Sequence, residues 1–167
     1  MKLLTISLLL CCALLLGSGQ VLAQDVLAPV VEISVEPSQS VCQVGKVCRL
    51  VVVVNIKEPY HINNNQPSSP ELIPTSFTIM DAEPGITLLG VSYPPAQKLQ
   101  IEGEKMPWLV WSGIITLQVE VMVGLGVVPG TYKILTILNY QACDDQTCQM
   151  PDSASAELVL SVVNNIE

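Results

Sequence analysis

Two cysteines near the end of the chain, Cys143 and Cys148, are the residues whose type and spacing could do chemistry. Four residues separate them, and these are typical of a turn between two strand-like runs. Residues opposed across an antiparallel turn have Cα atoms about 4.5–5.5 Å apart, which is within the range of a disulfide. The spacing therefore permits a small disulfide that either stabilises the turn or takes part in thiol–disulfide exchange.

The spacing alone leaves both interpretations open. In the chain-entropy model a loop this short contributes roughly 2 kcal/mol, against about 4.7 kcal/mol for a loop of about a hundred residues. A pair used mainly for stability would gain more by joining distant segments. Asp144 and Asp145 follow Cys143 directly, and nearby negative charge disfavours a thiolate. We therefore expect a free Cys143 to be a slow nucleophile until a partner docks.

A second close pair, Cys42 and Cys48, is expected to close a hairpin with Gly45 at its turn. A structural disulfide is the simplest interpretation, and a second redox pair and a zinc site that uses four cysteines are the alternatives. His61 is the only histidine, so no histidine-based metal site can form. It is either a packed loop residue or a residue that tunes a thiol. We expect neither a metal nor a cofactor.

The first 23 residues are typical of a secretory signal peptide. Lys2 precedes an apolar run, and Val21-Leu22-Ala23 supplies the small residues of a cleavage site, so the mature chain is expected to span residues 24–167. Export favours disulfides, and the protein is expected to be periplasmic or secreted, without stable membrane insertion after the leader is removed. The formal net charge of −8 argues against a nucleic-acid partner.

Apolar and polar residues alternate along most of the mature chain, whereas helical spacing with caps is absent. This period of two is typical of half-buried strands, and proline and glycine punctuate the gaps. About eight strands predict a single antiparallel β-sandwich domain. The longest connections are expected at residues 57–74 and 94–107, and long loops on a rigid sandwich often carry function. The clearest alternating runs are residues 31–36, 50–56, 77–79, 115–123, 132–143 and 154–163.

An ordered set of short motifs resembles one known family. The motifs are Tyr60-His61-Ile62-Asn63, Pro67, Leu72-Ile73-Pro74-Thr75, Tyr93-Pro94, and Tyr140-Gln141-Ala142-Cys143-Asp144-Asp145 followed by Cys148 and Pro151. Together they resemble the N-terminal periplasmic domain of the thiol:disulfide interchange protein DsbD, from about residue 30 to residue 163. The resemblance implies an all-β, immunoglobulin-like sandwich.

The resemblance also implies roles for individual residues. Cys143 and Cys148 match the family's reactive pair, with Cys143 expected to be attacked and Cys148 to resolve the mixed disulfide. Tyr60, His61 and Asn63 match a segment beside the cysteines. The residues expected to shape the site are Tyr60, His61, Asn63, Tyr140, Gln141, Asp144, Asp145 and Trp108. In the family a mobile loop shields the disulfide, and residues 100–108 correspond to it, with Trp108 or Met106 as the apolar cover; an ordinary hairpin loop is the alternative.

The sequence departs from the family in three respects. It ends at Glu167, without the membrane-embedded and thioredoxin-like domains, so the electron donor is expected to be a separately encoded protein. The cysteine spacing is one residue shorter than in the best-known member, and Cys42 and Cys48 are additional. The sequence thus predicts an exported module that relays reducing equivalents between thioredoxin-like partners, an activity of the protein-disulfide reductase type. The alternative is a non-enzymatic binding or structural domain with permanent disulfides.

Overall fold

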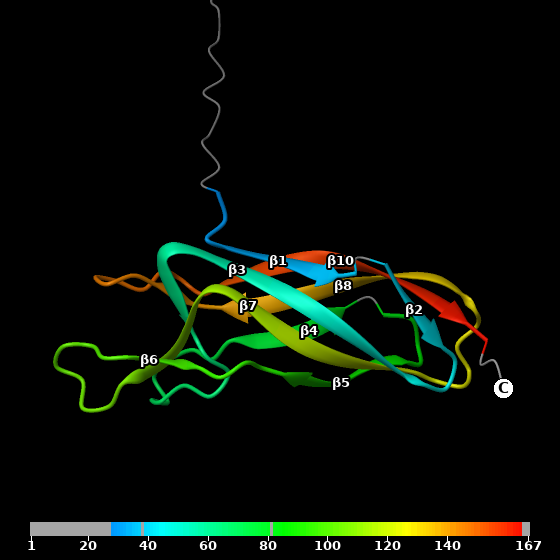
Figure 1. The fold of residues 1–167 in the computed structure, drawn as a ribbon, viewed down its shortest axis with the longest axis horizontal. Coiled ribbons are helices and arrows are strands. Elements are labelled where there is room, and N and C mark those ends of the chain that lie inside the picture. Colours follow the sequence, from blue (N-terminus) through cyan, green and yellow to red (C-terminus); the bar gives the residue numbers. More distant parts are fainter. Residues whose placement is uncertain (1–27, 38, 81, 165–167) are drawn as a thin grey trace, which may run out of the picture.

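The computed structural model describes residues 28–37, 39–80 and 82–164, and the expected leader with its cleavage site after Ala23 lies outside these ranges. Within them the chain forms strands and turns, with no helix, in two sheets (Figure 1). The predicted all-β, immunoglobulin-like sandwich is confirmed. The strands are β1 (Val31–Glu36), β2 (Gln39–Gln43), β3 (Val47–Asn63), β4 (Ser76–Met80), β5 (Ile86–Ser92), β6 (Gln97–Leu99), β7 (Trp108–Val123), β8 (Gly130–Tyr140), β9 (Ala142–Cys143) and β10 (Asp152–Val163).

The two sheets have different strand orders. The first sheet runs β1-β3-β7-β5, and the short strands β6 and β9 add to β7 and β3 at one end. The second sheet runs β2-β10-β8-β4. Neighbouring strands are antiparallel, except that β2 and β10 run parallel. The expected antiparallel sandwich therefore contains one parallel pair, which alternation along each strand cannot reveal.

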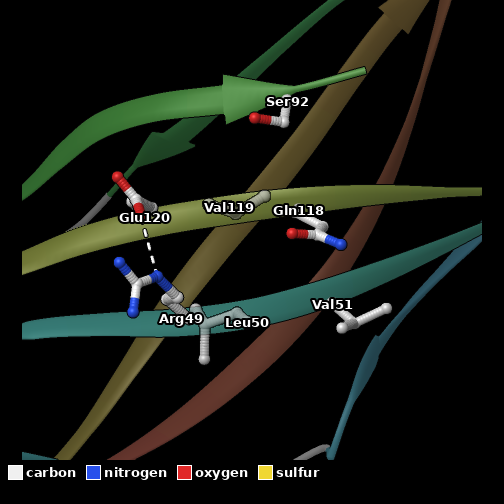
Figure 2. Close-up of a pocket in the computed structure, with 7 residues that line it drawn as sticks. All are labelled: Arg49, Leu50, Val51, Ser92, Gln118, Val119 and Glu120. Carbon is white, nitrogen blue, oxygen red and sulfur yellow. Dashed lines mark hydrogen bonds and ion pairs between the residues drawn. The ribbon is translucent and has the colours of Figure 1, made fainter. Parts of the chain in front are cut away.

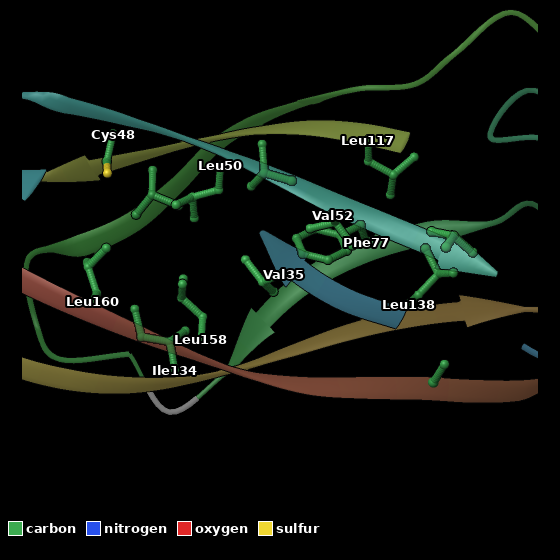
Figure 3. Close-up of a cluster of buried hydrophobic side chains, with 14 of the residues drawn as sticks. Val35, Cys48, Leu50, Val52, Phe77, Leu117, Ile134, Leu138, Leu158 and Leu160 are labelled. Atoms are coloured by element: carbon green, nitrogen blue, oxygen red, sulfur yellow. The ribbon is translucent and has the colours of Figure 1, made fainter. Parts of the chain in front are cut away.

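The hydrophobic core lies between the two sheets and follows the predicted alternation. Leu50 and Val52 of β3 and Leu117 of β7 face Ile134 and Leu158 of the second sheet (Figure 3). All five side chains are at most 3% exposed. Full burial of an aliphatic side chain of this size contributes about 1.5–3 kcal/mol, so these inward rows hold the two sheets together.

A large bulge interrupts β3 near one end of the first sheet. Ile56 pairs with Gly113 of β7, but the adjacent residue of β7, Ser112, pairs with His61. Residues 57–60 therefore have no partner on β7. Pro59 lies among them, and proline, which has no amide donor, is typically found at such bulges. Before the bulge β1 pairs with β3, and after it β9 takes that side.

The chain changes sheets at Gln141. The expected continuous strand over residues 132–143 is wrong, because β8 ends at Tyr140 in the second sheet and β9 pairs with β3 in the first. Both segments alternate, and alternation does not reveal to which sheet a strand belongs. This crossing brings Cys143 beside His61.

The expected hairpin between Cys42 and Cys48 is also wrong. Cys42 lies on β2 and Cys48 on β3, and these strands belong to different sheets. Both strands pair with other neighbours, so the turn with Gly45 at a φ of 74° connects the two layers. The disulfide between Cys42 and Cys48, with Cα atoms 5.5 Å apart, therefore joins the sheets and belongs to the core cluster.

Candidate functional site: a disulfide hairpin

A short hairpin carries the disulfide between Cys143 and Cys148. The two residues form an isolated antiparallel bridge, with Cα atoms 4.0 Å apart. The amide of Gln149 donates to the carbonyl of Ala142 at 2.8 Å, and that of Asp144 donates to the carbonyl of Thr147 at 2.9 Å. The expected disulfide across a turn is thus present, and backbone hydrogen bonds hold the hairpin on both sides of it.

Four residues lie in register across this end of the first sheet. Ser112 of β7 pairs with His61 of β3, His61 pairs with Cys143 of β9, and Cys143 pairs with Cys148. We call them the lateral row. Opposed residues of antiparallel strands point to the same face, with Cβ atoms about 4.5–5.5 Å apart. Sequence motifs could not reveal the place of Ser112, because the strand register brings it beside His61, where both line one hollow.

The two cysteines differ sharply in burial. Cys143 is 1% exposed, whereas Cys148 is an exposed residue. Cys143 is also outside the core cluster, which contains its neighbours Ala142 and Ile62. Since successive strand residues face opposite sides of a sheet, Cys143 and His61 lie on the outer face. The disulfide therefore joins a covered sulfur to an exposed residue, away from the main core.

Asp144 organises the turn. Its Oδ1 accepts hydrogen bonds from the amides of Gln146 and Thr147, both at 2.8 Å. These hydrogen bonds stabilise the carboxylate and hold the pKa of Asp144 below its ordinary value. Asp145 instead lies beside the hollow that His61 lines. The two predicted aspartates are thus both at the site, one as a turn cap and one as a nearby charge.

Tyr140 and Gln141 attach the base of the hairpin to the sandwich. Tyr140 is 3% exposed and part of the core, and its hydroxyl donates to Asp152 Oδ2 at 3.3 Å. Burial and the nearby Asp152 carboxylate raise the pKa of Tyr140 to about 12. Gln141 Nε2 donates to the carbonyl of Gln149 at 3.0 Å. These two hydrogen bonds connect the base of the hairpin to the rest of the sandwich.

The segment after the bulge surrounds the covered sulfur. His61 is 6% exposed, and Asn63 is fully buried. Neither His61 Nε2 nor Asn63 Oδ1 has a hydrogen-bond partner. Asn63 Nδ2 donates to the carbonyl of Ile73 at 3.1 Å, which fixes the loop after β3. Tyr60 is half-buried and lines one hollow with His61 and Asp145. The structure therefore places Tyr60 and His61 at the hairpin, and Asn63 one pleat further along β3.

Burial affects the ionisation of His61. Loss of hydration lowers the pKa of His61 below its ordinary value, and the negative charges of Asp145 and Asp144 oppose that change. The imidazole is therefore neutral at pH 7. A neutral imidazole has one nitrogen that donates and one that accepts a hydrogen bond.

The loop expected to shield the disulfide follows β6, whose residues line the same hollow as His61. Residues 100–107 connect β6 to β7, and Gln100 Nε2 closes this loop on itself through the carbonyl of Glu104 at 3.1 Å. Trp108 lines a hollow with Ser68 and Ser69, and Met106 is 62% exposed. Trp108 is four residues along β7 from Ser112, about 13 Å at the rise of a strand. The structure therefore does not bring Trp108 to the lateral row.

Another hollow lies on the outer face of the first sheet, where β3, β7 and β5 meet. Arg49 Nε donates to Glu120 Oε1 at 2.9 Å along its wall, and Ser92 contributes from β5 (Figure 2). None of the predicted site residues lines it. Among the described residues, no three histidine, cysteine or acidic side chains are arranged to hold a metal ion. The hairpin is thus the feature with assignable chemistry.

Comparisons with solved structures give matches at low sequence identity. No family model and no curated protein matches the sequence. The N-terminal periplasmic domain of ScsB from Proteus mirabilis is similar with a TM-score of 0.49 and 8% identity, over 78% of this chain and 45% of that one. A family 123 glycoside hydrolase from Clostridium perfringens has a TM-score of 0.41 and 10% identity, over 83% of this chain and 28% of that one. The periplasmic chaperone SfaE has a TM-score of 0.35 and 11% identity, over 78% of this chain and 55% of that one.

The chain thus spans less than half the length of the first two of these proteins. Two of the three are described as periplasmic. Within the described ranges we find no helical segment with the length and apolar character that a bilayer crossing requires. Fold and site together define an immunoglobulin-like sandwich that carries a surface disulfide hairpin.

Proposed function

We propose that the chain is an exported thiol–disulfide exchange module, active in the periplasm or after secretion, with Cys143 and Cys148 as its redox pair. The observation that carries this proposal is the unequal burial of the two cysteines. Cys148 is open to a docking thiol, while Cys143 is 1% exposed on a hairpin outside the main core. A disulfide that only stabilised the sandwich would gain more in the core, where Cys42 and Cys48 already join the sheets.

The reaction begins at the accessible sulfur. A thiolate of a reduced thioredoxin-like partner attacks Cys148 Sγ, the bond between Cys143 and Cys148 breaks, and Cys143 leaves as a thiolate. The partner's second thiolate then attacks the partner's own sulfur in the mixed disulfide and releases Cys148. Two electrons pass from the partner's dithiol to this chain, which binds two protons as both sulfurs become thiols. An acceptor disulfide is reduced by the reverse sequence.

This order is opposite to the one expected from the sequence. The resemblance placed the attack at Cys143, but Cys143 is covered while Cys148 is exposed. Thiol–disulfide exchange depends on access to the attacked sulfur. Cys148 is therefore the residue that forms the mixed disulfide, and Cys143 is the resolving residue. Suitable partners are thioredoxin-like periplasmic proteins and a separately encoded membrane electron carrier.

Trapping tests this proposal. A C143A variant, expressed with its leader in a bacterial host, should accumulate mixed disulfides through Cys148 on a non-reducing gel. C148A should accumulate far fewer, because the remaining sulfur is buried. C42A/C48A/C143A is the matched control and should keep the adducts of C143A. Adducts in C148A but not in C143A would restore the original order, and adducts in neither variant would contradict the exchange function.

The second candidate function is a structural or binding sandwich with permanent disulfides. The hydrogen-bonded hairpin favours it, because Gln149, Asp144 and Gln141 hold the two cysteines close together. A reduction potential of the pair below about −300 mV would assign this role, since disulfides of that potential resist physiological reductants. A higher potential, measured by equilibration with glutathione, is expected for exchange.

A further inference from the structure

The lateral row places an unsatisfied imidazole beside the covered sulfur. His61 and Cys143 are directly paired on neighbouring antiparallel strands, so their side chains share the outer face of the sheet. Both are almost fully buried, at 6% and 1% exposure. Across the described residues, the buried side-chain nitrogen and oxygen atoms without a hydrogen-bond partner are His61 Nε2 and Asn63 Oδ1. An orphaned polar atom therefore lies in the residue next to the sulfur that leaves during reduction.

A buried polar nitrogen without a partner destabilises the state that contains it. In the disulfide form, the sulfur of Cys143 is bonded to Cys148 and is at most a weak acceptor. When the disulfide is reduced, Cys143 becomes a thiolate and then a thiol, and a sulfur anion accepts hydrogen bonds far better than a disulfide sulfur does. Reduction thus creates an acceptor on the residue paired with His61, whose Nε2 has no partner.

We propose that His61 is a positioning residue for the redox pair, and that its Nε2–H donates a hydrogen bond to the sulfur of Cys143 when the disulfide opens. This inference rests on the proposed function, because it concerns the same disulfide. As the bond between Cys143 and Cys148 breaks, the electron pair stays on Cys143, and the imidazole stabilises that charge until the sulfur binds a proton. His61 thereby favours the reduced form and makes Cys143 a better leaving group.

Other charged groups face His61 and bear on the pH dependence. Asp144 and Asp145 approach from the hairpin, and Lys98 of β6 and Tyr60 of the bulge line the same hollow. The two aspartates disfavour a thiolate on Cys143. A hydrogen bond from a neutral imidazole opposes that effect without introducing a further charge. His61 consequently explains how a sulfur beside two carboxylates can leave.

The test compares His61→Phe with His61→Gln in the full chain, at matched pH. His61→Phe removes the donor, and the equilibrium constant for reduction by dithiothreitol should fall about tenfold, the effect of one buried hydrogen bond. His61→Gln keeps an amide N–H near the position of Nε2 and should recover most of that loss. Ser92→Ala, in the hollow that none of the predicted site residues lines, is the control and should leave the equilibrium unchanged.

A second readout separates this role from a merely structural one. In a Cys148→Ser background, the thiolate absorbance of Cys143 near 240 nm should be about tenfold weaker in His61→Phe than with His61 present, at a pH where the thiol is partly ionised. Equal thiolate fractions and an unchanged equilibrium constant would overturn the proposal. These measurements use the isolated protein, so a failure of partner trapping would leave them interpretable.

A third measurement, the nitrogen NMR of His61, uses the wild-type chain and so does not require a variant that folds. His61 is its only histidine, so nitrogen NMR of untagged protein shows a single imidazole. The Nε2 resonance should shift on reduction as the nitrogen gains an acceptor, with the proton still on Nε2. An Nε2 resonance that is the same in the oxidised and reduced protein would overturn the proposal even if His61→Phe did not fold.

Discussion

Removal of the disulfide between Cys42 and Cys48 should destabilise the sandwich without affecting exchange at the hairpin. The perturbation is the double variant C42A/C48A. The cysteines are separated by 6 positions in the sequence, and the chain-entropy model gives a loop of that size roughly 2 kcal/mol. Both residues belong to the core cluster, at 4% and 8% exposure. Treating each lost sulfur as about one buried methylene adds roughly 1 to 2 kcal/mol.

We therefore expect the free energy of unfolding to fall by about 3 to 4 kcal/mol in C42A/C48A. The matched comparison is C143A/C148A, whose cysteines are separated by 5 positions. Its entropic contribution is similar, roughly 2 kcal/mol. Cys143 is buried but Cys148 is exposed, so one lost sulfur rather than two adds about 0.8 kcal/mol. The second variant should therefore lose roughly 1 kcal/mol less than the first.

Urea unfolding under non-reducing conditions measures both losses, and the fluorescence of Trp111, which is 1% exposed, reports the transition. The mixed disulfides formed through Cys148 should persist in the C42A/C48A background. The reasoning would be refuted if C143A/C148A proved the less stable variant, or if C42A/C48A lost less than about 1 kcal/mol. Either result would mean that the core disulfide does not join the sheets in the way its position indicates.

Two further predictions concern hydrogen bonds at the hairpin. Tyr140→Phe should cost about 1 kcal/mol of stability at neutral pH, because the buried hydroxyl loses its bond to Asp152. The pKa of Tyr140 is raised from 10.0 to about 12 in the folded protein. The contribution of Tyr140 to wild-type stability should therefore be complete below pH 10 and decline as the pH rises toward 12. Urea titrations of the variant should lack this decline. Asp144→Ala should speed hydrogen exchange at the amides of Gln146 and Thr147, since both donate to Asp144 Oδ1. The pKa of Asp144 is lowered from 3.8 in the folded protein. In the wild type the protection of these amides should therefore be present above pH 3.8 and be lost as the pH falls through the folded-state pKa of Asp144. Slow exchange in the variant would contradict the capping role.

The alternation of apolar residues predicted the longer strands and the core, but β2, β5 and β6 lie outside the alternating runs. Leu50, Val52 and Leu158 face inward as the period of two predicts, although Val52 lies between Val51 and Val53 in the sequence. The same pattern could not show that the chain changes sheets at Gln141. Nor could it show that β2 pairs with β10 rather than with β3, because strand pairing is a property of distant segments.

The candidate site was predictable in its residues but not in its geometry. The motifs identified Cys143, Cys148 and His61, and the structure brings all three into one row. The bulge at residues 57–60 sets that register, and no local signal other than Pro59 marks it. Trp108 was assigned to the site by resemblance alone, and in the structure it lines a hollow with Ser68 and Ser69. Which cysteine is covered depends on tertiary packing, so the burial of Cys143 could not be predicted either.

Strands that pair with other strands of the sandwich flank the disulfide hairpin on both sides. β9 is paired with β3 in the first sheet, and β10 is paired with β8 in the second. The four residues between the cysteines add nothing to the core cluster. Protein engineers could therefore exchange this tetrapeptide for others, and so adjust how readily the bond reacts, while the rest of the chain served as an unchanged host.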